Sequence, residues 1–146
     1  MENNDNKPEN VVADYYDGYA DVQKDVLAIE IRKTRNTLFI LAALVFGTDL
    51  LALAVANVVM PLTIFAIAIV PLLLVGLAFL ATKEPVTAMI IAAVIIVGLW
   101  IYNIYITGGR AAIMGWLIKA VIAYLIIAGF QHAREATRIK KELSLK

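Results

Sequence analysis

Residues 37–59 read TLFILAALVFGTDLLALAVANVV, an apolar run interrupted by one acid, Asp49. A run of this length matters because about 20 helical residues cross the ~30 Å hydrocarbon core of a bilayer. Three further apolar runs follow at residues 62–81, 86–106 and 111–130. Hydrophobic residues make up 62% of the 146-residue chain, against roughly 45–50% in soluble domains. We therefore predict an all-α integral membrane protein, with a four-transmembrane-helix bundle over residues 37–130.

The connections between the runs are short, which predicts an up-down-up-down bundle whose consecutive helices are antiparallel neighbours. Apart from Arg110 and Lys119, the lysines and arginines precede the first run, separate the second from the third or follow the fourth. Basic residues in short segments stay in the cytoplasm, so we expect both termini there. Because the loops are minimal, we expect the membrane to be a bacterial inner membrane. The residues expected to set this topology at the headgroups are Arg32, Lys33, Arg35, Arg134, Arg138, Lys140 and Lys141.

Asp49 and Lys119 are the charged residues inside the apolar runs. Asp49 follows Thr37 by 12 residues and Lys119 precedes Gln131 by 12 residues, so both lie roughly 18 Å from the same side of the membrane. A charge at mid-span costs ~2.5–3.5 kcal/mol on insertion scales, and pairing relieves that cost. We predict an intramembrane ion pair between the first and last spans. It could clamp the helix register, relay protons or ions, or place one charge against another subunit.

Three other residues within or beside the runs have expected roles. Pro71 falls in the middle of the second run and removes one helical hydrogen bond, so we predict a kink there. Asn103, near the end of the third run, is expected to form a hydrogen bond between helices. His132 follows the fourth run, and as the single histidine of the chain it is expected to be solvated at the level of the headgroups.

The N-terminal residues change character at residue 14. Residues 1–13 are polar and predict a disordered acidic tail, whereas residues 14–36 predict a cytoplasmic amphipathic helix that ends in a basic collar. Its apolar stripe, the expected partner-docking face, consists of Tyr15, Tyr19, Val22, Val26 and Ile29. Eight acids and two lysines in residues 1–30 disfavour anionic lipid as the surface that this face contacts. A protein partner and the bundle's own cytoplasmic ends remain as alternatives.

The sequence contains no cysteine, nucleophile elbow, metal-ligand cluster or glycine-rich phosphate loop. We therefore expect no enzyme activity, no cofactor, no metal, no nucleic-acid partner and no identifiable small-molecule substrate. Residues 131–146 predict a basic helical extension in the cytoplasm. The expected function is that of a non-catalytic structural, anchoring or regulatory subunit of a membrane assembly, in contact with lipid and with a protein partner or further copies. The alternative is an oligomeric small transporter or channel component, in which Asp49 and Lys119 couple transport to proton movement.

Overall fold

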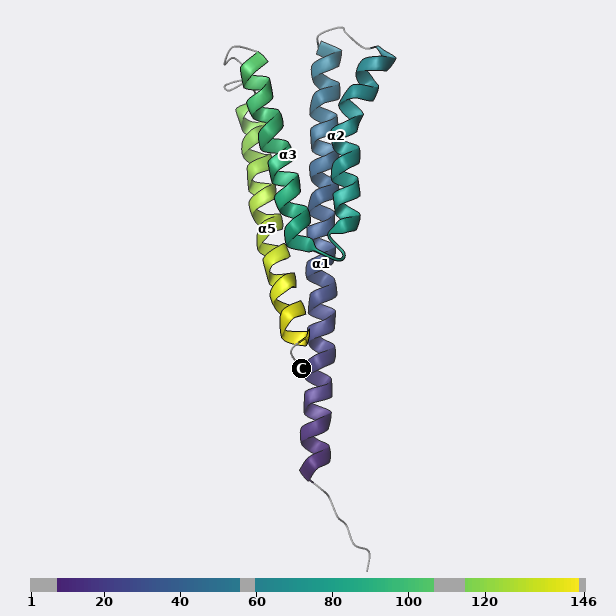
Figure 1. Ribbon diagram of the computed structural model, residues 1–146, viewed down its shortest axis with the longest axis vertical. Helices are drawn as coiled ribbons and strands as arrows, with labels where there is room; N and C mark the ends of the chain where they lie inside the picture. The colour runs from purple at the N-terminus through teal and green to yellow at the C-terminus, as the bar shows by residue number, and fades with distance from the viewer. Residues whose placement is uncertain (1–7, 56–59, 107–114, 145–146) are drawn as a thin grey trace, which may run out of the picture.

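The computed structural model describes residues 8–55, 60–106 and 115–144, and the side chains of these residues except 8–17 and 20. Its helices are α1 (Pro8–Val55), α2 (Pro61–Leu80), α3 (Pro85–Ile106) and α5 (Trp116–Ser144) (Figure 1). All four are long and apolar enough to cross a membrane. The predicted all-α, four-helix architecture is confirmed, and the chain is an integral membrane protein.

The outward faces of the helices are apolar, as contact with lipid requires. Leu62, Phe65, Leu72, Val94 and Ile101 are between 64% and 81% exposed. Water would penalise such a continuous apolar surface, whereas hydrocarbon covers it at no cost. The exposed faces and the helix lengths therefore point to the same environment.

Prolines and a tight turn set where the central helices begin and how they are connected. Pro61 and Pro85 each occupy the first position of their helix, where the missing N–H would have had no helical partner. Between α2 and α3, the N–H groups of Lys83 and Glu84 both donate to the carbonyl of Leu80 at 3.0 Å. This turn closes within four residues, so α3 runs back alongside α2. We refer to the end of the bundle that contains this turn as the base, and to the opposite end as the mouth.

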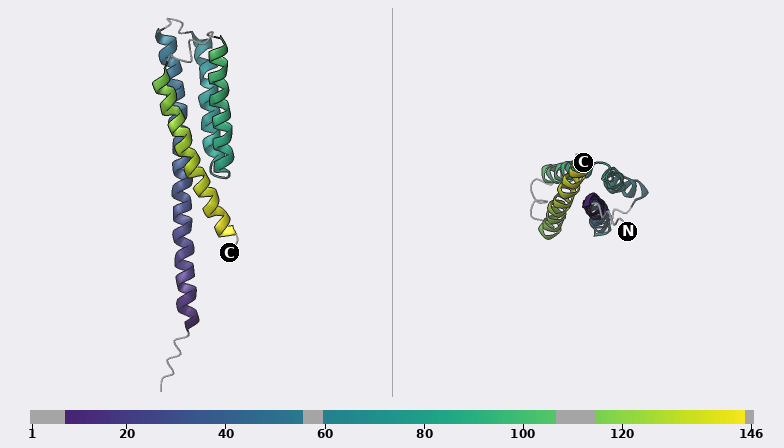
Figure 2. Two further views of the ribbon diagram at one scale, coloured as in Figure 1. Left: turned by 90° about the vertical axis from the view of Figure 1, so that its left-hand side faces the viewer. Right: turned by 90° about the horizontal axis from the view of Figure 1, so that it is seen from below.

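Helix α1 is continuous across the boundary that the sequence predicted at residues 36 and 37. It also begins at Pro8, inside the predicted disordered tail, of which residues 1–7 lie outside the described residues. Its 48 residues correspond to about 72 Å of helix. Residues 8–36, here called the α1 extension, contain no proline after Pro8 and project beyond the base, past the end of α5 (Figures 1 and 2).

The tightly packed core lies in the half of the bundle next to the base. It consists of Leu38, Leu41, Ala42 and Val45 of α1, Leu74 and Ala78 of α2, Ala88, Met89, Ala92 and Ile96 of α3, and Ile122 and Ala133 of α5, with Ala81 from the turn. None of the described α1 residues beyond Val45 is buried. Figure 1 shows the reason: the pair α1 and α2 diverges from the pair α3 and α5 toward the mouth.

Helices α1, α3 and α5 come close together at Gly129. A Cβ atom at this position would lie 2.6 Å from Met89 Cε and 3.0 Å from Thr37 Cγ2. The absence of a side chain therefore permits the contact, as small residues do between membrane helices. Ala133 and Ala136 continue the buried face of α5 toward its C-terminal end, where α5 lies along the α1 extension.

Candidate functional site

A cavity of about 520 Å³ lies between the diverging helix pairs. Residues of all four helices line it, and most of them are apolar. Its polar side chains are those of Thr48, Asp49, Asn103 and Lys119, with Trp100 beside them. Both charged residues that the sequence singled out therefore face the same chamber, which we call the mouth cavity.

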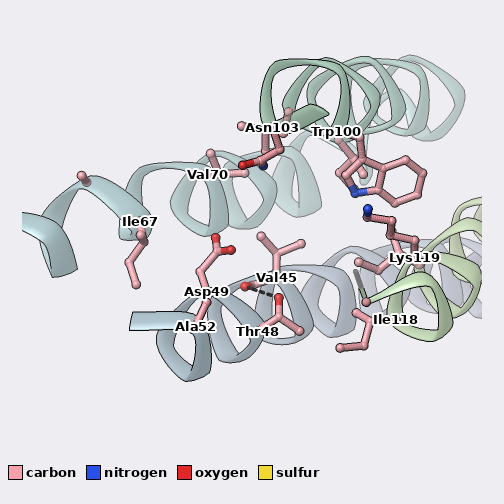
Figure 3. A pocket seen from close by; sticks show the side chains of 15 residues that line it. Val45, Thr48, Asp49, Ala52, Ile67, Val70, Trp100, Asn103, Ile118 and Lys119 are labelled. Carbon is pink, nitrogen blue, oxygen red and sulfur yellow. Dashed lines mark hydrogen bonds between the residues drawn. The ribbon is translucent and has the colours of Figure 1, made fainter. Parts of the chain in front are cut away.

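Asp49 contributes a carboxylate to the cavity wall formed by α1. The side chain is partly buried and points into the cavity (Figure 3). The neighbouring Thr48 hydroxyl donates to the carbonyl of Val45 at 2.9 Å and so is directed at its own helix. Among the residues that the structure describes, none donates a hydrogen bond to the Asp49 carboxylate or forms an ion pair with it. Its hydrogen-bonding capacity is therefore directed toward the cavity.

Lys119 contributes an ammonium group from α5. Figure 3 shows its Nζ pointing toward the ring of Trp100, while Asn103 projects from α3 nearer to Asp49. The structure differs here from the predicted ion pair, because no ion pair between the described residues joins Asp49 to Lys119. Depth counting placed the two charges in one chamber, but the divergence of the helix pairs keeps their charged groups apart.

An ion pair between α1 and α5 lies instead near the base, on the N-terminal side of the apolar run of α1. The Glu30 side chain is only 12% exposed; its Oε2 lies 2.6 Å from Nδ1 of His132, and its Oε1 accepts a hydrogen bond from Lys33 Nζ at 2.7 Å. Burial alone would raise the pKa of this carboxyl group. The hydrogen bonds from Lys33 and His132 outweigh that effect and hold the pKa below its ordinary value of 4.5.

Sequence reasoning missed this contact because it treated His132 as a solvated residue. His132 keeps 36% of its side chain exposed, yet it binds the buried carboxylate, because α5 continues as a helix past residue 130 and lies against α1. The available signal was the small-residue stripe of Gly129, Ala133 and Ala136, which predicts a close helix contact beside residue 132.

The described side chains of the predicted docking stripe on the α1 extension are exposed. Tyr19, Val22, Val26 and Ile29 are 49%, 61%, 40% and 50% exposed, and the side chain of Tyr15 lies outside the described ones. α5 covers a different face of α1, where Glu30 contacts His132 and the Gln23 amide donates to Glu142 at 3.5 Å. The bundle's own C-terminal helix therefore packs on the extension without occupying the stripe.

The residues predicted to set topology gather near the base on α1 and α5. Arg32, Lys33, Arg134, Arg138, Lys140 and Lys141 are exposed, and Arg35 is partly buried. Lys140 Nζ donates to the carbonyl of Lys83 at 2.9 Å, which connects α5 to the turn between α2 and α3. Pro71 is buried within α2, which continues as one helix on both sides of it; the kink stays a prediction.

The described residues contain no group of three histidines or acids that could hold a metal ion. An acid and an amine in an apolar chamber can bind groups of opposite charge or exchange protons. No protein family, curated protein or solved structure matches the chain. We therefore infer function from the geometry of the mouth cavity and of the α1 extension.

Proposed function

We propose that this protein is a non-catalytic anchoring subunit that holds another protein chain at the membrane through its α1 extension. The observation that carries the proposal is the exposure of the apolar stripe at Val22, Val26 and Ile29, next to Tyr19. Water disfavours apolar side chains exposed as one contiguous row, and such rows mark interaction surfaces. The distribution of basic residues supports a cytoplasmic extension, with both termini on the inner face of a bacterial cytoplasmic membrane.

The spacing of the stripe specifies a helix as the binding partner. Positions 15, 19, 22, 26 and 29 alternate steps of four and three residues, which is the a and d pattern of a coiled coil. Tyr19 and Val26 then occupy a positions, and Val22 and Ile29 occupy d positions. Because α5 packs on another face of α1, one more helix can pack along this seam.

A second copy of the chain is the partner that the geometry favours. Two copies inserted in the same orientation present their α1 extensions parallel and at the same height above the membrane, so their seams match without any adjustment of register. A symmetric dimer also requires a self-complementary patch, which an apolar a and d seam provides. The acids at 14, 17, 21 and 25 give a useful distinction: salt would screen repulsion between two copies but would weaken attraction to a basic partner.

The test measures self-association of the full chain in detergent micelles or nanodiscs by fluorescence energy transfer. Val26→Glu places a charge in the seam, and Ala28→Glu adds the same charge at an exposed position on the opposite face of the helix. Burial of one valine contributes roughly 1.5–3 kcal/mol, so Val26→Glu should weaken association at least about tenfold, and Ala28→Glu should leave it unchanged. Equal association of both variants and the unmodified chain would refute the proposed seam. Absence of energy transfer between copies of the unmodified chain would exclude a second copy as the partner, and a fall in energy transfer with rising salt would show that charge attraction rather than the apolar seam holds the copies together.

A second candidate function, small-solute or proton-coupled transport, is favoured by the mouth cavity. Transporters place their substrate sites within the membrane where helices meet, and the mouth cavity lies between the helix pairs with the packed core on its side toward the base. Proton or solute flux into liposomes that is lost in Asp49→Asn would support transport. Absence of flux under a pH gradient and under a solute gradient would exclude it.

A further inference from the structure

The mouth cavity contains one acidic and one basic side chain within an otherwise mainly apolar wall. Asp49 belongs to α1 and Lys119 to α5, so the two groups approach the chamber from different helices. A ligand with only a positive charge would be attracted by Asp49 and repelled by Lys119. An anion would be attracted by Lys119 and repelled by Asp49. A ligand with both charges and no net charge matches both groups at once.

The state of the Asp49 carboxylate strengthens this argument. It has no hydrogen-bond donor among the described residues, and a charged group in apolar surroundings is costly unless a donor satisfies it. An ammonium group supplies such donors together with the complementary charge. Lys119 can serve an anionic group whatever its other contacts, because an ammonium carries three N–H donors.

The size and the lining of the chamber define the rest of the ligand. A volume of about 520 Å³ lies within the range of 300–1,000 Å³ that is typical of small-molecule sites. Val45, Val70, Leu99 and Ile118 are among the apolar lining residues, so a hydrocarbon portion would be accommodated beside the charges. Asn103 adds an amide that can donate and accept hydrogen bonds.

We propose that the mouth cavity binds a zwitterion with an apolar portion, its ammonium group at Asp49 and its phosphate or carboxylate at Lys119. The shared chemistry has two sources: a free apolar amino acid, and the headgroup of an ethanolamine phospholipid. The proposal builds on the transport candidate, because it names the class of molecule that the cavity would take. It is separate from the self-association of the α1 extension, which uses a different part of the molecule.

The first experiment uses the unmodified full chain, purified in detergent, and measures binding of L-leucine by isothermal titration calorimetry. Two matched half-ligands are 3-methylbutylamine, which lacks the carboxylate, and 4-methylpentanoate, which lacks the ammonium group. Loss of either charge-assisted hydrogen-bonded contact should weaken binding by about tenfold or more. In the lipid arm, native mass spectrometry compares retention of phosphatidylethanolamine and phosphatidylglycerol with identical chains. Preferential binding of leucine supports the free zwitterion, and preferential retention of phosphatidylethanolamine supports the lipid.

Variants then locate the bound molecule. Asp49→Asn and Lys119→Gln should each reduce binding of the preferred zwitterion by about tenfold or more, whereas Lys83→Gln, which makes the same change at an exposed position in the turn between α2 and α3, should leave binding unchanged. Far-ultraviolet circular dichroism and size-exclusion chromatography check that each variant is folded. If a variant does not fold, the half-ligand comparison on the unmodified chain still decides the question.

The proposal would be overturned if a half-ligand binds as tightly as leucine while the two lipids are retained equally. It would also be overturned if leucine is not preferred over its half-ligands and phosphatidylethanolamine is not preferred over phosphatidylglycerol. Unchanged binding in a folded Asp49→Asn variant is the third result that would overturn it. Transport has separate outcomes. Zwitterion binding without flux in liposomes would exclude transport and support the binding site. Proton flux without zwitterion binding would support transport and exclude the proposed ligand.

Discussion

Replacement of Glu30 by glutamine should destabilise the contact between the α1 extension and α5. The carboxylate accepts hydrogen bonds of 2.7 Å from Lys33 and 2.6 Å from His132, taken as the donor, while its own side chain is 12% exposed. Hydrogen bonds to charged groups contribute about 1.5–3 kcal/mol each, and disruption of a fully buried ion pair costs about 3–5 kcal/mol. The partners are 49% and 36% exposed, so they recover hydration. We therefore expect a loss of about 1.5–3 kcal/mol in the free energy of unfolding.

The assay is reversible unfolding of the full chain in mixed micelles, followed by circular dichroism, with amide hydrogen exchange to locate the change near the base. Arg138→Ala is the matched control, since it removes the exposed ion pairs to Glu135 at 3.7 Å and Glu142 at 3.1 Å. Exposed pairs contribute about 0–1 kcal/mol. A double-mutant cycle of Glu30→Gln with His132→Ala should give a coupling energy of at least about 1 kcal/mol. Additive effects in that cycle would refute the reasoning.

Acidification should reduce the stabilising contribution of Glu30. The pKa of Glu30 is lower in the folded chain than its ordinary value of 4.5. Its contribution to stability is therefore complete above about pH 4.5 and is lost as the pH falls through the lowered pKa. Between about pH 7 and pH 3, the free energies of unfolding of the unmodified chain and of Glu30→Gln should therefore converge as the pH falls. A difference between the two free energies that stays constant with pH would contradict this. Gly129→Ala should destabilise the bundle, since overpacking against Met89 costs about 1–3 kcal/mol and the gain in helix propensity is only about 0.5–1 kcal/mol. In Gly98→Ala the added Cβ atom meets no atom within 4 Å, so thermal unfolding should show only the stabilisation from helix propensity. Gly115→Ala should cost about 1–2 kcal/mol in the same assay, because Gly115 has a φ of +70° that residues with a Cβ atom adopt only with strain.

The sequence was sufficient to predict the spans because hydrocarbon thickness fixes their length and composition. The predicted runs at 62–81 and 86–106 differ by one residue at most from each end of α2 and α3. The predicted start of α1 was less accurate, because the helix begins at Pro8 and not at residue 14. Residues 1–13 are mostly polar, and polarity alone does not distinguish a disordered tail from the solvated first turns of a long helix whose later residues are packed.

Depth along two helices can be counted from the sequence, but the distance between them cannot. Counting brought Asp49 and Lys119 to the same level, and both line one cavity. Whether they touch depends on how the helix pairs diverge, which is set by packing near the base, where Gly129 allows α5 to approach Thr37. The contact of Glu30 with His132 joins residues 102 positions apart, and it depends on the same crossing of α5 over α1.

The unbroken course of α1 has a mechanical consequence. Tyr19 and Asp49 are 30 residues apart on one helix, a separation of roughly 45 Å, with no proline between them to act as a joint. The crossing at Glu30 and His132 lies between these two points, and so does the packed segment of α1 at Leu38, Leu41 and Val45. A displacement of the extension would therefore reach the chamber beside Asp49 only through the helices that pack on that segment.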